Sequence, residues 1–178
     1  MDKIATDRLE LRPFSISDIK PLTEIANDPS IADSMISIPH PYTIQYAKQW
    51  IKKAEKKMSA DIAYIYAISL KEDKRLIGAI ELRTIEREHL QAELSFWIAS
   101  EWQGRGYATE AAKAMIKFGL NTLGLNRIYA HHMLRNRLSE KVLKKIGMSH
   151  EGIMKQRVIK WGIFEDVGFY AIIKQDLY

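Results

Sequence analysis

One segment constrains this chain most: a strand-like run that leads through a glycine turn into a helix-like run. Residues 91–100, QAELSFWIAS, are predicted to form a strand whose side chains alternate between two faces, and the turn EWQGRG follows at 101–106. From 107 to 122, apolar residues recur every three or four positions, which predicts a helix with one buried face. Glycine costs backbone entropy, so Gly104 and Gly106 indicate an unusual backbone conformation or a close approach at this turn.

The rest of the chain predicts helices and strands in mixed order. Thr43 and Asn136 are expected to cap helices, and ISIPHPYT at 36–43 is expected to be a loop. We predict helices near 19–26, 44–58 and 136–146, and strands near 8–14, 63–70, 75–85, 126–134, 151–160 and 164–174. This order predicts a mixed sheet with helices on its faces, an α/β or α+β sandwich. The chain has no repeat or flexible linker, so we expect a single domain over residues 1–178.

Composition limits the possible chemistry. The chain of 178 residues has no cysteine, which excludes disulfides, thiolate metal sites and a cysteine nucleophile, and which fits a cytoplasmic protein. No apolar run is long enough to predict a transmembrane helix or a signal peptide, so we expect no membrane partner. The formal net charge of +5 favours anionic partners such as phosphates or nucleotides, but a generally basic surface explains it equally well.

The glycine turn has the features of an anion site. The start of a helix exposes unpaired N–H groups and carries partial positive charge. Without side chains at Gly104 and Gly106, phosphates can approach those groups closely, and Arg105 adds a cation. The turn therefore predicts a site that accepts a pyrophosphate.

Three glycine-loop patterns compete at this turn, alongside an ordinary helix start with no ligand. The Walker A pattern is absent, and the dinucleotide pattern lacks its third glycine and follows several strands rather than the first. The third pattern, the acyl-CoA pyrophosphate loop [QR]-x-x-G-x-[GA], is matched by residues 103–108, QGRGYA. A pattern of six residues is loose, so its sequence context has to decide.

Four stretches give that context: TDRLELRPF at 6–14, PHPYTIQYAKQWI at 39–51, AELSFWIASEWQGRGYATEAAKAMIKFGL at 92–120 and LNRIYAHHMLRNRLSEKVLKKIGMSHEG at 125–152. In these stretches the chain resembles the GNAT superfamily of acetyl-CoA-dependent N-acyltransferases. Within the superfamily it is similar to the Rim-type ribosomal-protein N-terminal acetyltransferases, over nearly its whole length. The resemblance implies a mostly antiparallel sheet of about seven strands with helices on both faces. It also implies acetyl-CoA as cosubstrate, with no metal.

The resemblance assigns donor-binding roles to particular positions. The backbone of Phe96, Trp97 and Ile98 would bind the pantetheine arm, on a strand that is splayed from its neighbour, and an N–H near Ile98 would polarise the thioester carbonyl. Asn136 would also bind the pantetheine, and Ser139 would lie near the CoA sulfur. The pyrophosphate would be held by the turn and the first helical residues, Gln103, Gly104, Arg105, Gly106, Tyr107, Ala108 and Thr109.

Glu93 is the candidate proton acceptor, because it lies on the same strand with its side chain opposite Leu94 and Phe96. An ordinary strand carboxylate paired with an arginine is an equally good interpretation. An α-amino group has a pKa near 7.7–8.0, against about 10.4 for lysine, so an N-terminal amine needs only a weak base.

The leaving thiolate has a weaker candidate for its proton donor. Many superfamily members have a tyrosine four residues after the serine position, whereas this chain has Leu143, which cannot donate a proton. A CoA thiol should resemble cysteine, with a pKa near 8.5, so Ser139 or water would suffice.

The acceptor stays open in the sequence. We expect the N-terminal amine of a protein, with a ribosomal protein as first choice, and a polyamine, amino acid or aminoglycoside as alternative. A non-catalytic acyl-CoA-binding module is a further possibility, because Leu143 cannot donate a proton to the leaving thiolate. His131 and His132 are adjacent on a strand and point to opposite faces, so they predict no metal site. We expect no nucleic-acid partner, and either a monomer or a homodimer.

Overall fold

The computed structural model describes residues 3–177 and contains an eight-stranded sheet. Its strand order is β1-β2-β3-β4-β5-β6-β8-β7. The strands are β1 Ile4–Ala5, β2 Leu9–Pro13, β3 Tyr64–Leu70, β4 Leu76–Glu86, β5 Gln91–Ile98, β6 Arg127–Met133, β7 Ser149–Lys160 and β8 Ile163–Ile173. The helices are α1 Ile19–Ala26, α2 Pro29–Ser34, α3 Ile44–Ser59, α4 Tyr107–Lys117 and α5 Arg137–Lys145. The predicted mixed, mostly antiparallel sheet is confirmed.

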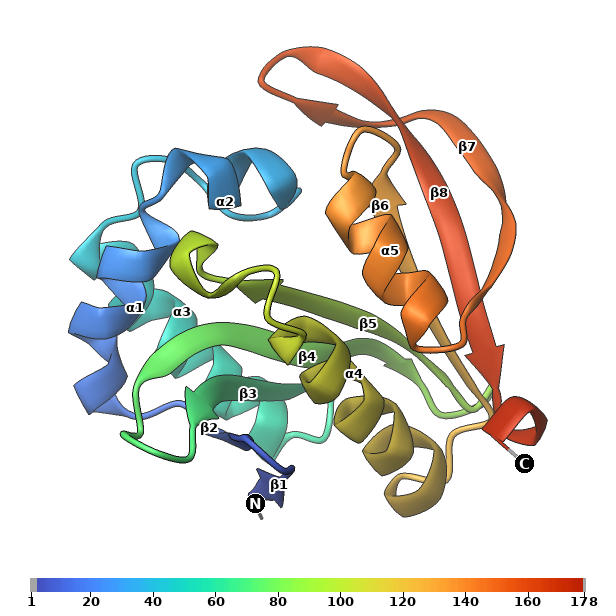
Figure 1. Cartoon of the computed structure of the whole chain (residues 1–178), viewed down its shortest axis with the longest axis horizontal. Helices are drawn as coiled ribbons and strands as arrows, with labels where there is room; N and C mark the ends of the chain where they lie inside the picture. The colour runs from blue at the N-terminus through green and yellow to red at the C-terminus, as the bar shows by residue number, and fades with distance from the viewer. Residues whose placement is uncertain (1–2, 178) are drawn as a thin grey trace.

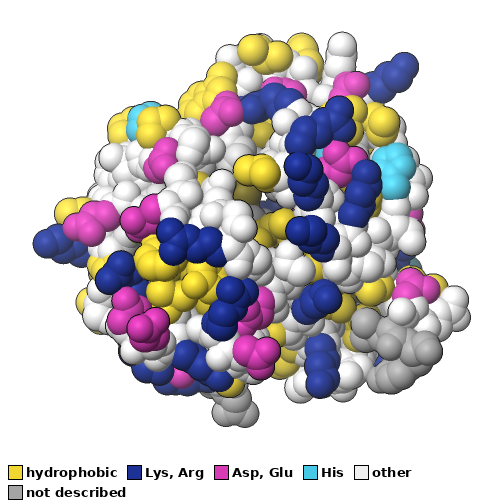
Figure 2. Space-filling model, viewed as in Figure 1, with side chains coloured by type: hydrophobic (Ala, Val, Ile, Leu, Met, Phe, Trp, Pro, Cys, Tyr) yellow, Lys and Arg dark blue, Asp and Glu magenta, His cyan; other side chains and the backbone are white. Residues whose placement is uncertain are grey.

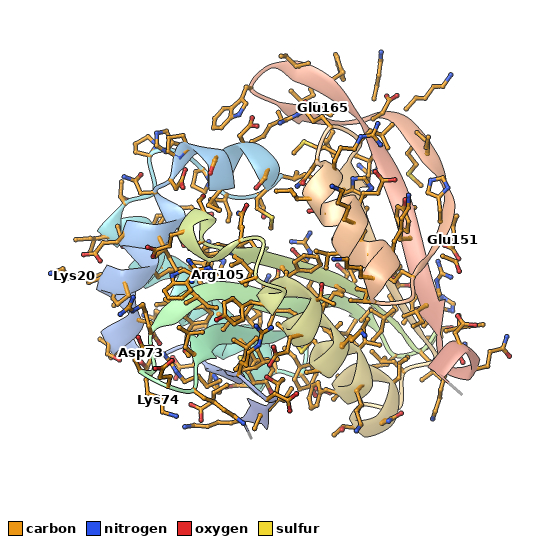
Figure 3. All side chains as sticks on the ribbon, viewed as in Figure 1. Lys20, Asp73, Lys74, Arg105, Glu151 and Glu165 are labelled. Atoms are coloured by element: carbon orange, nitrogen blue, oxygen red, sulfur yellow. The ribbon has the colours of Figure 1, made fainter. Side chains whose placement is uncertain are left out.

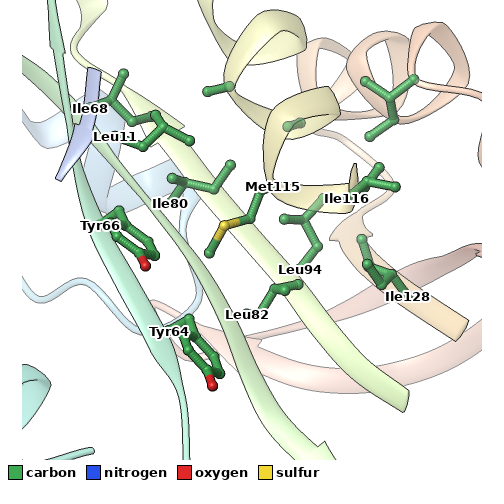
Figure 4. Packing of buried hydrophobic residues seen from close by; sticks show 14 of the residues in the cluster. Leu11, Tyr64, Tyr66, Ile68, Ile80, Leu82, Leu94, Met115, Ile116 and Ile128 are labelled. Carbon is green, nitrogen blue, oxygen red and sulfur yellow. The ribbon is translucent and has the colours of Figure 1, made fainter. Parts of the chain in front are cut away.

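Helices cover both faces of the sheet, as expected. In Figure 1, α4 lies in front of the central strands and α3 lies behind them, while α5 lies in front of β6 and β8. The alternation of β5 produces this arrangement, because Leu94 and Ile98 pack with the α4 side of the core while Trp97 packs with α1 and α3. Figure 4 shows Met115 and Ile116 of α4 against the side chains of the sheet.

β5 and β6 run parallel and separate after a short paired stretch. Their backbones are in register over Gln91–Arg127, Ala92–Ile128 and Glu93–Tyr129, whereas β5 continues to Ile98 and β6 to Met133. The splay expected for this strand is therefore present. Figure 1 shows the two strands diverging toward the ends that carry the α4 and α5 helix starts.

The structure adds elements that the sequence analysis did not predict. The two-residue strand β1 extends the sheet, and α2 lies in a stretch before the expected loop at 36–43 for which no element was predicted. The helix expected over 107–122 is α-helical only to Lys117 and ends in a π-helical turn over Phe118–Thr122. Gly119 in that turn packs so tightly that a Cβ atom would lie 2.7 Å from the Ile128 side chain.

The predicted helix caps are present. Thr43 Oγ1 accepts a hydrogen bond from the Tyr46 N–H at 3.2 Å, and Asn136 Oδ1 accepts one from the Ser139 N–H at 3.1 Å. Leu138, an apolar residue in the first turn of α5, is 61% exposed. Its side chain lies on the rim of a groove described below.

Candidate active site

An open groove of about 380 Å³ runs from the splayed half of β5 to the starts of α4 and α5. Figure 2 shows a hollow near the centre of this face, with Lys and Arg side chains gathered beside it over α5. Of the predicted cofactor-binding residues, all except Arg105 line the groove, namely Phe96, Trp97, Ile98, Gln103, Gly104, Gly106, Tyr107, Ala108, Thr109, Asn136 and Ser139. The structure thus brings together segments that are more than thirty residues apart in the sequence.

The glycine turn adopts a backbone that favours glycine. Gly104 has φ 77° and Gly106 has φ 83°, both in the left-handed region. A Cβ atom on Gly104 would meet nothing within 4 Å, and on Gly106 it would meet only the Arg8 guanidinium, at 3.4 Å. The Glu110 N–H donates to the Gly106 carbonyl at 3.0 Å, so the N–H groups before Glu110 precede the first intrahelical bond of α4. The open space and free donors fit a pyrophosphate.

Arg105 does not line the groove. Its guanidinium stacks on the Trp102 ring at 4.8 Å and donates to the Glu101 carbonyl at 3.1 Å. Figure 3 labels Arg105 beside the turn, ahead of α4. Its backbone carbonyl accepts a hydrogen bond from Arg8 Nη1 at 3.1 Å, and Arg8 also pairs with Glu110 at 2.7 Å. Arg8, which the sequence analysis did not single out, thus braces the turn from the segment that leads into β2.

Two of the three α5 lysines face the groove. Lys141 and Lys145 line it, whereas the Nζ of Lys144 binds Glu140 at 2.7 Å on the helix surface. Because residues three and four apart share a helix face, the spacing of Lys141 and Lys145 explains their common orientation. These two cations add to the positive potential at the α4 start.

The free backbone of β5 points into the splay. The Ala99 N–H donates to the Ile77 carbonyl of the neighbouring strand β4 at 2.8 Å. Because N–H directions alternate along a strand, the N–H groups of Ile98 and Phe96 point away from β4, toward the gap. The Ile98 carbonyl accepts a hydrogen bond from Gln103 Nε2 at 2.9 Å, so that side chain anchors the turn to the strand.

A second, smaller cavity of about 50 Å³ continues the groove through the sheet. Phe96, Asn136 and Ser139 line both spaces. The small cavity is also lined by Glu93 and His131, on the strands β5 and β6 where these separate. A molecule bound in the groove can therefore meet, at the shared wall, a group that enters from the Glu93 side.

Glu93 is paired with an arginine, which was one of the two interpretations of the sequence, and its side chain also lines the small cavity. Its Oε1 accepts a hydrogen bond from Arg83 Nη2 at 2.6 Å. Arg83 Nη1 in turn binds Glu81 at 3.0 Å, while burial raises the pKa of Glu81. His131 Nδ1 lies 3.3 Å from Glu93 Oε1. Burial lowers the pKa of His131, although the Glu93 charge opposes that shift.

Asn136 and Ser139 lie at the start of α5, where the two spaces meet. Besides capping the helix, Asn136 donates from Nδ2 to the Ser34 carbonyl at 3.3 Å, which ties α5 to α2. Leu143 is buried and lines the small cavity, so a side chain without a proton donor occupies the position where many family members have a tyrosine.

Polar contacts join the end of α2 and the loop after it to the β7–β8 hairpin. Lys160 Nζ, near the turn between β7 and β8, donates to the carbonyls of Met35 at 2.8 Å and Ile38 at 3.2 Å. Arg135 binds Asp33 and Glu165, the latter at 2.6 Å; Glu165 is labelled on the β7–β8 hairpin in Figure 3. These contacts hold the loop after α2 against the hairpin, beside the small cavity that Met35, Ile36 and Ser37 line.

Metal-binding and membrane-spanning features are both missing from the part of the chain that the structure describes. Residues 3–177 contain no cluster of three His, Cys, Asp or Glu side chains arranged to hold a metal ion. Within the same residues, no helix is long and apolar enough to cross a membrane.

Comparison with known proteins agrees with this geometry. YnaD of Bacillus subtilis, an N-acetyltransferase by name, is 32% identical over 174 residues, which cover 97% of this chain and 98% of YnaD. The solved structure of RimL, a ribosomal L7/L12 alpha-N-protein acetyltransferase in complex with coenzyme A, superimposes with a TM-score of 0.90 at 20% identity, covering 97% of this chain and 98% of RimL. The structure of spermidine N-acetyltransferase from Vibrio cholerae, in complex with CoA and spermine, superimposes with a TM-score of 0.84 at 23% identity. The match covers 97% of this chain and 100% of the Vibrio chain. Residues 8–149 match the family model of the acetyltransferase (GNAT) domain, and this chain is accordingly an N-acetyltransferase of the GNAT family.

Proposed function

We propose that this protein transfers the acetyl group of acetyl-CoA to the N-terminal α-amine of a protein in the cytoplasm, with a ribosomal protein as the first choice. The whole chain, residues 1–178, would act as one acetyltransferase domain. One observation carries the proposal: the groove at the glycine turn meets the Glu93 cavity at a shared wall formed by Phe96, Asn136 and Ser139. A donor and an acceptor can thus be held in contact within one complex.

On the donor side, the open turn at Gly104 and Gly106 would hold the pyrophosphate, because its N–H groups are free and no side chain blocks them. Lys141 and Lys145 would meet a further phosphate of CoA. The N–H of Ile98 would polarise the thioester carbonyl, a contribution of about 10²–10³ in rate for one such donor. Acetyl-CoA supplies the activated acyl group.

On the acceptor side, the amine would enter between the loop after α2 and the β7–β8 hairpin. Removal of the amine proton would depend on the Glu93 carboxylate, which lines the small cavity. Ser139 or water would protonate the departing thiolate. Because the thiol pKa resembles that of cysteine, about 8.5, Leu143 in place of a stronger donor is compatible with turnover.

Charge favours a protein N-terminus over a polyamine. The Glu93 carboxylate is already paired with Arg83, and the Lys160 cation binds the loop after α2. A polycation such as spermidine would bind best among unpaired carboxylates. A mono-cationic α-amine, a small part of which is neutral near pH 7, needs no such excess of negative charge.

The test measures CoA release with acetyl-CoA and a panel of acceptors. Peptides that begin with Ala, Ser or Met should be acetylated on their α-amine, as mass spectrometry of the products would locate. Matched peptides with a blocked N-terminus and an internal lysine are the control. Faster turnover with spermidine, an amino acid or an aminoglycoside would transfer the assignment to a small amine, and CoA binding without transfer to any amine would leave a non-catalytic module.

A further inference from the structure

His131 lies two residues beyond the point where β5 and β6 cease to pair. Tyr129 is in register with Glu93, so His131 projects on the same face of the sheet as that carboxylate. Its ring stacks on Phe169 of β8, with centroids 5.3 Å apart and an interplanar angle of 24°. The ring lines the small cavity opposite the uncharged residues 34–37. His131 is thus held in a fixed orientation inside the proposed acceptor site.

The two nitrogens of the His131 ring have different surroundings. Nδ1 is shielded from solvent and, within the described residues, has no hydrogen bond of good geometry, but Oε1 of Glu93 lies 3.3 Å from it. The side chain as a whole is 19% exposed, so the accessible part of the ring lies away from Nδ1. A lone pair on Nδ1 would face the carboxylate unfavourably, whereas an N–H there faces it favourably. The Glu93 charge therefore favours the neutral tautomer with its proton on Nδ1 and a lone pair on Nε2.

The charges around His131 come from several elements. Burial lowers the pKa of His131, Glu93 on β5 raises it, and Arg83 on β4, Arg157 on β7 and the neighbouring His132 lower it. The net shift is downward from the ordinary value near 6.5, so the imidazole is neutral at neutral pH. A neutral imidazole that stays beside a carboxylate is a competent proton acceptor.

We propose that Nε2 of His131 takes the proton of the acceptor amine and that Glu93 is a positioning residue, which orients the ring and stabilises the imidazolium. This rests on the proposed function only in requiring a primary-amine acceptor. As the amine nitrogen forms its bond to the acetyl carbon, the carbon–sulfur bond breaks and its electron pair leaves on sulfur. The amine proton goes to Nε2, and the thiolate takes a proton from Ser139 or water.

Arg83 explains why the carboxylate itself is the poorer acceptor. The oxygen that faces His131, Oε1 of Glu93, also accepts the 2.6 Å hydrogen bond from Arg83. Protonating the carboxylate on either oxygen would remove the negative charge that strengthens the bond from Arg83, whereas protonating the imidazole adds a second cation next to the same anion. The arrangement matches the general pattern in which a base is oriented by a third group.

A titration by NMR of the ¹⁵N-labelled protein tests the proposal without any acceptor. The imidazole of His131 should be the Nδ1–H tautomer, with a pKa below 6.5, and Glu93→Gln should lower that pKa further because the raising charge is removed. His89→Gln, in the exposed turn before β5, assists assignment and should leave His131 unchanged. An Nε2–H tautomer, or a His131 pKa that is insensitive to Glu93→Gln, would overturn the proposal.

Kinetics with acetyl-CoA and the best acceptor amine give the second readout. His131→Gln should lower kcat by about 10²–10⁴-fold, as removal of a general base does. The rise of kcat with pH below the amine pKa should disappear in this variant. Its affinity for CoA should be unchanged. His131→Gln with the wild-type rate and pH profile would refute the role. A protein inactive with every amine would refute the proposed function instead, and the NMR titration would still decide the arrangement of Glu93 and His131.

Discussion

Replacing Gly106 with alanine separates the conformational role of the glycine turn from its role in binding. Gly106 has φ 83° and lines the groove, and a Cβ atom there would meet only the Arg8 guanidinium, at 3.4 Å. Steric damage inside the protein is therefore small. The left-handed backbone costs an L-residue about 1–2 kcal/mol, which for a chain of this size lowers Tm by roughly 2–8 °C.

Gly124 is the matched control, because it has φ 70° and a Cβ atom added to it would meet nothing within 4 Å, but it lies outside the groove. Gly124→Ala should lower Tm by a similar amount and leave the affinity for CoA unchanged. Because Gly106 itself lines the groove, we expect the added methyl in Gly106→Ala to hinder the approach of a phosphate oxygen to the N–H groups of the turn. Loss of one hydrogen bond to a charged group costs about 1.5–3 kcal/mol, equivalent to about 10- to 150-fold weaker binding.

Isothermal titration calorimetry with CoA, alongside thermal denaturation, measures both quantities. The reasoning requires that the two variants agree in Tm loss and differ in Kd. Equal CoA affinities in wild type, Gly106→Ala and Gly124→Ala would show that the turn does not hold the pyrophosphate.

Three further changes have defined outcomes. Lys145→Ala should weaken CoA binding more than Lys144→Ala, because only Lys145 lines the groove, and equal effects in calorimetry would contradict this. Gly78→Ala should unfold the protein at a markedly lower temperature, since its Cβ would lie 2.2 Å from a backbone carbonyl oxygen of β5, and an unchanged Tm would refute the packing. Asp18→Asn should destabilise the fold by about 3–5 kcal/mol at neutral pH because it leaves Arg12 without its buried partner. Burial raises the Asp18 pKa, but Arg12 and Ser15 lower it overall. The stabilisation is therefore fully present above the unfolded pKa near 3.9 and is lost as the pH falls through the folded pKa. Acid titration of Asp18→Asn should lack this loss of stability.

Much of the fold follows from periodicity alone. The alternation in β5 determined which side chains pack with α4 and which with α1 and α3, and Thr43 and Asn136 cap their helices as predicted. The two-residue strand β1 and the six-residue helix α2 were missed, because segments this short contain too few residues for a period to be visible.

The candidate site, like the fold, could be predicted only in part from the sequence. The glycine turn could be predicted because its left-handed backbone conformation favours glycine, which is visible in the sequence. The contacts of Glu93 with Arg83 and His131 depend on the register between three strands, which adjacent residues in the sequence do not encode. Arg8 was missed for a related reason, since its bond to the Arg105 carbonyl spans the whole first half of the chain. Residue type thus points to the proposed donor site, while the proposed acid–base residues can be recognised only in the assembled sheet.

The parallel pairing of β5 with β6 has a consequence for how binding specificity can change. A parallel neighbour requires the chain to cross over, and the crossover here is α4, so the helix start must stand at the end of β5 where the strands separate. The connectivity of the chain thereby fixes one end of the groove. Polar contacts join the α2–α3 loop to the β7–β8 hairpin, and the crossover includes neither segment. Under the proposed function, substitutions in those two segments would change which amine is accepted while the crossover would keep the donor in place.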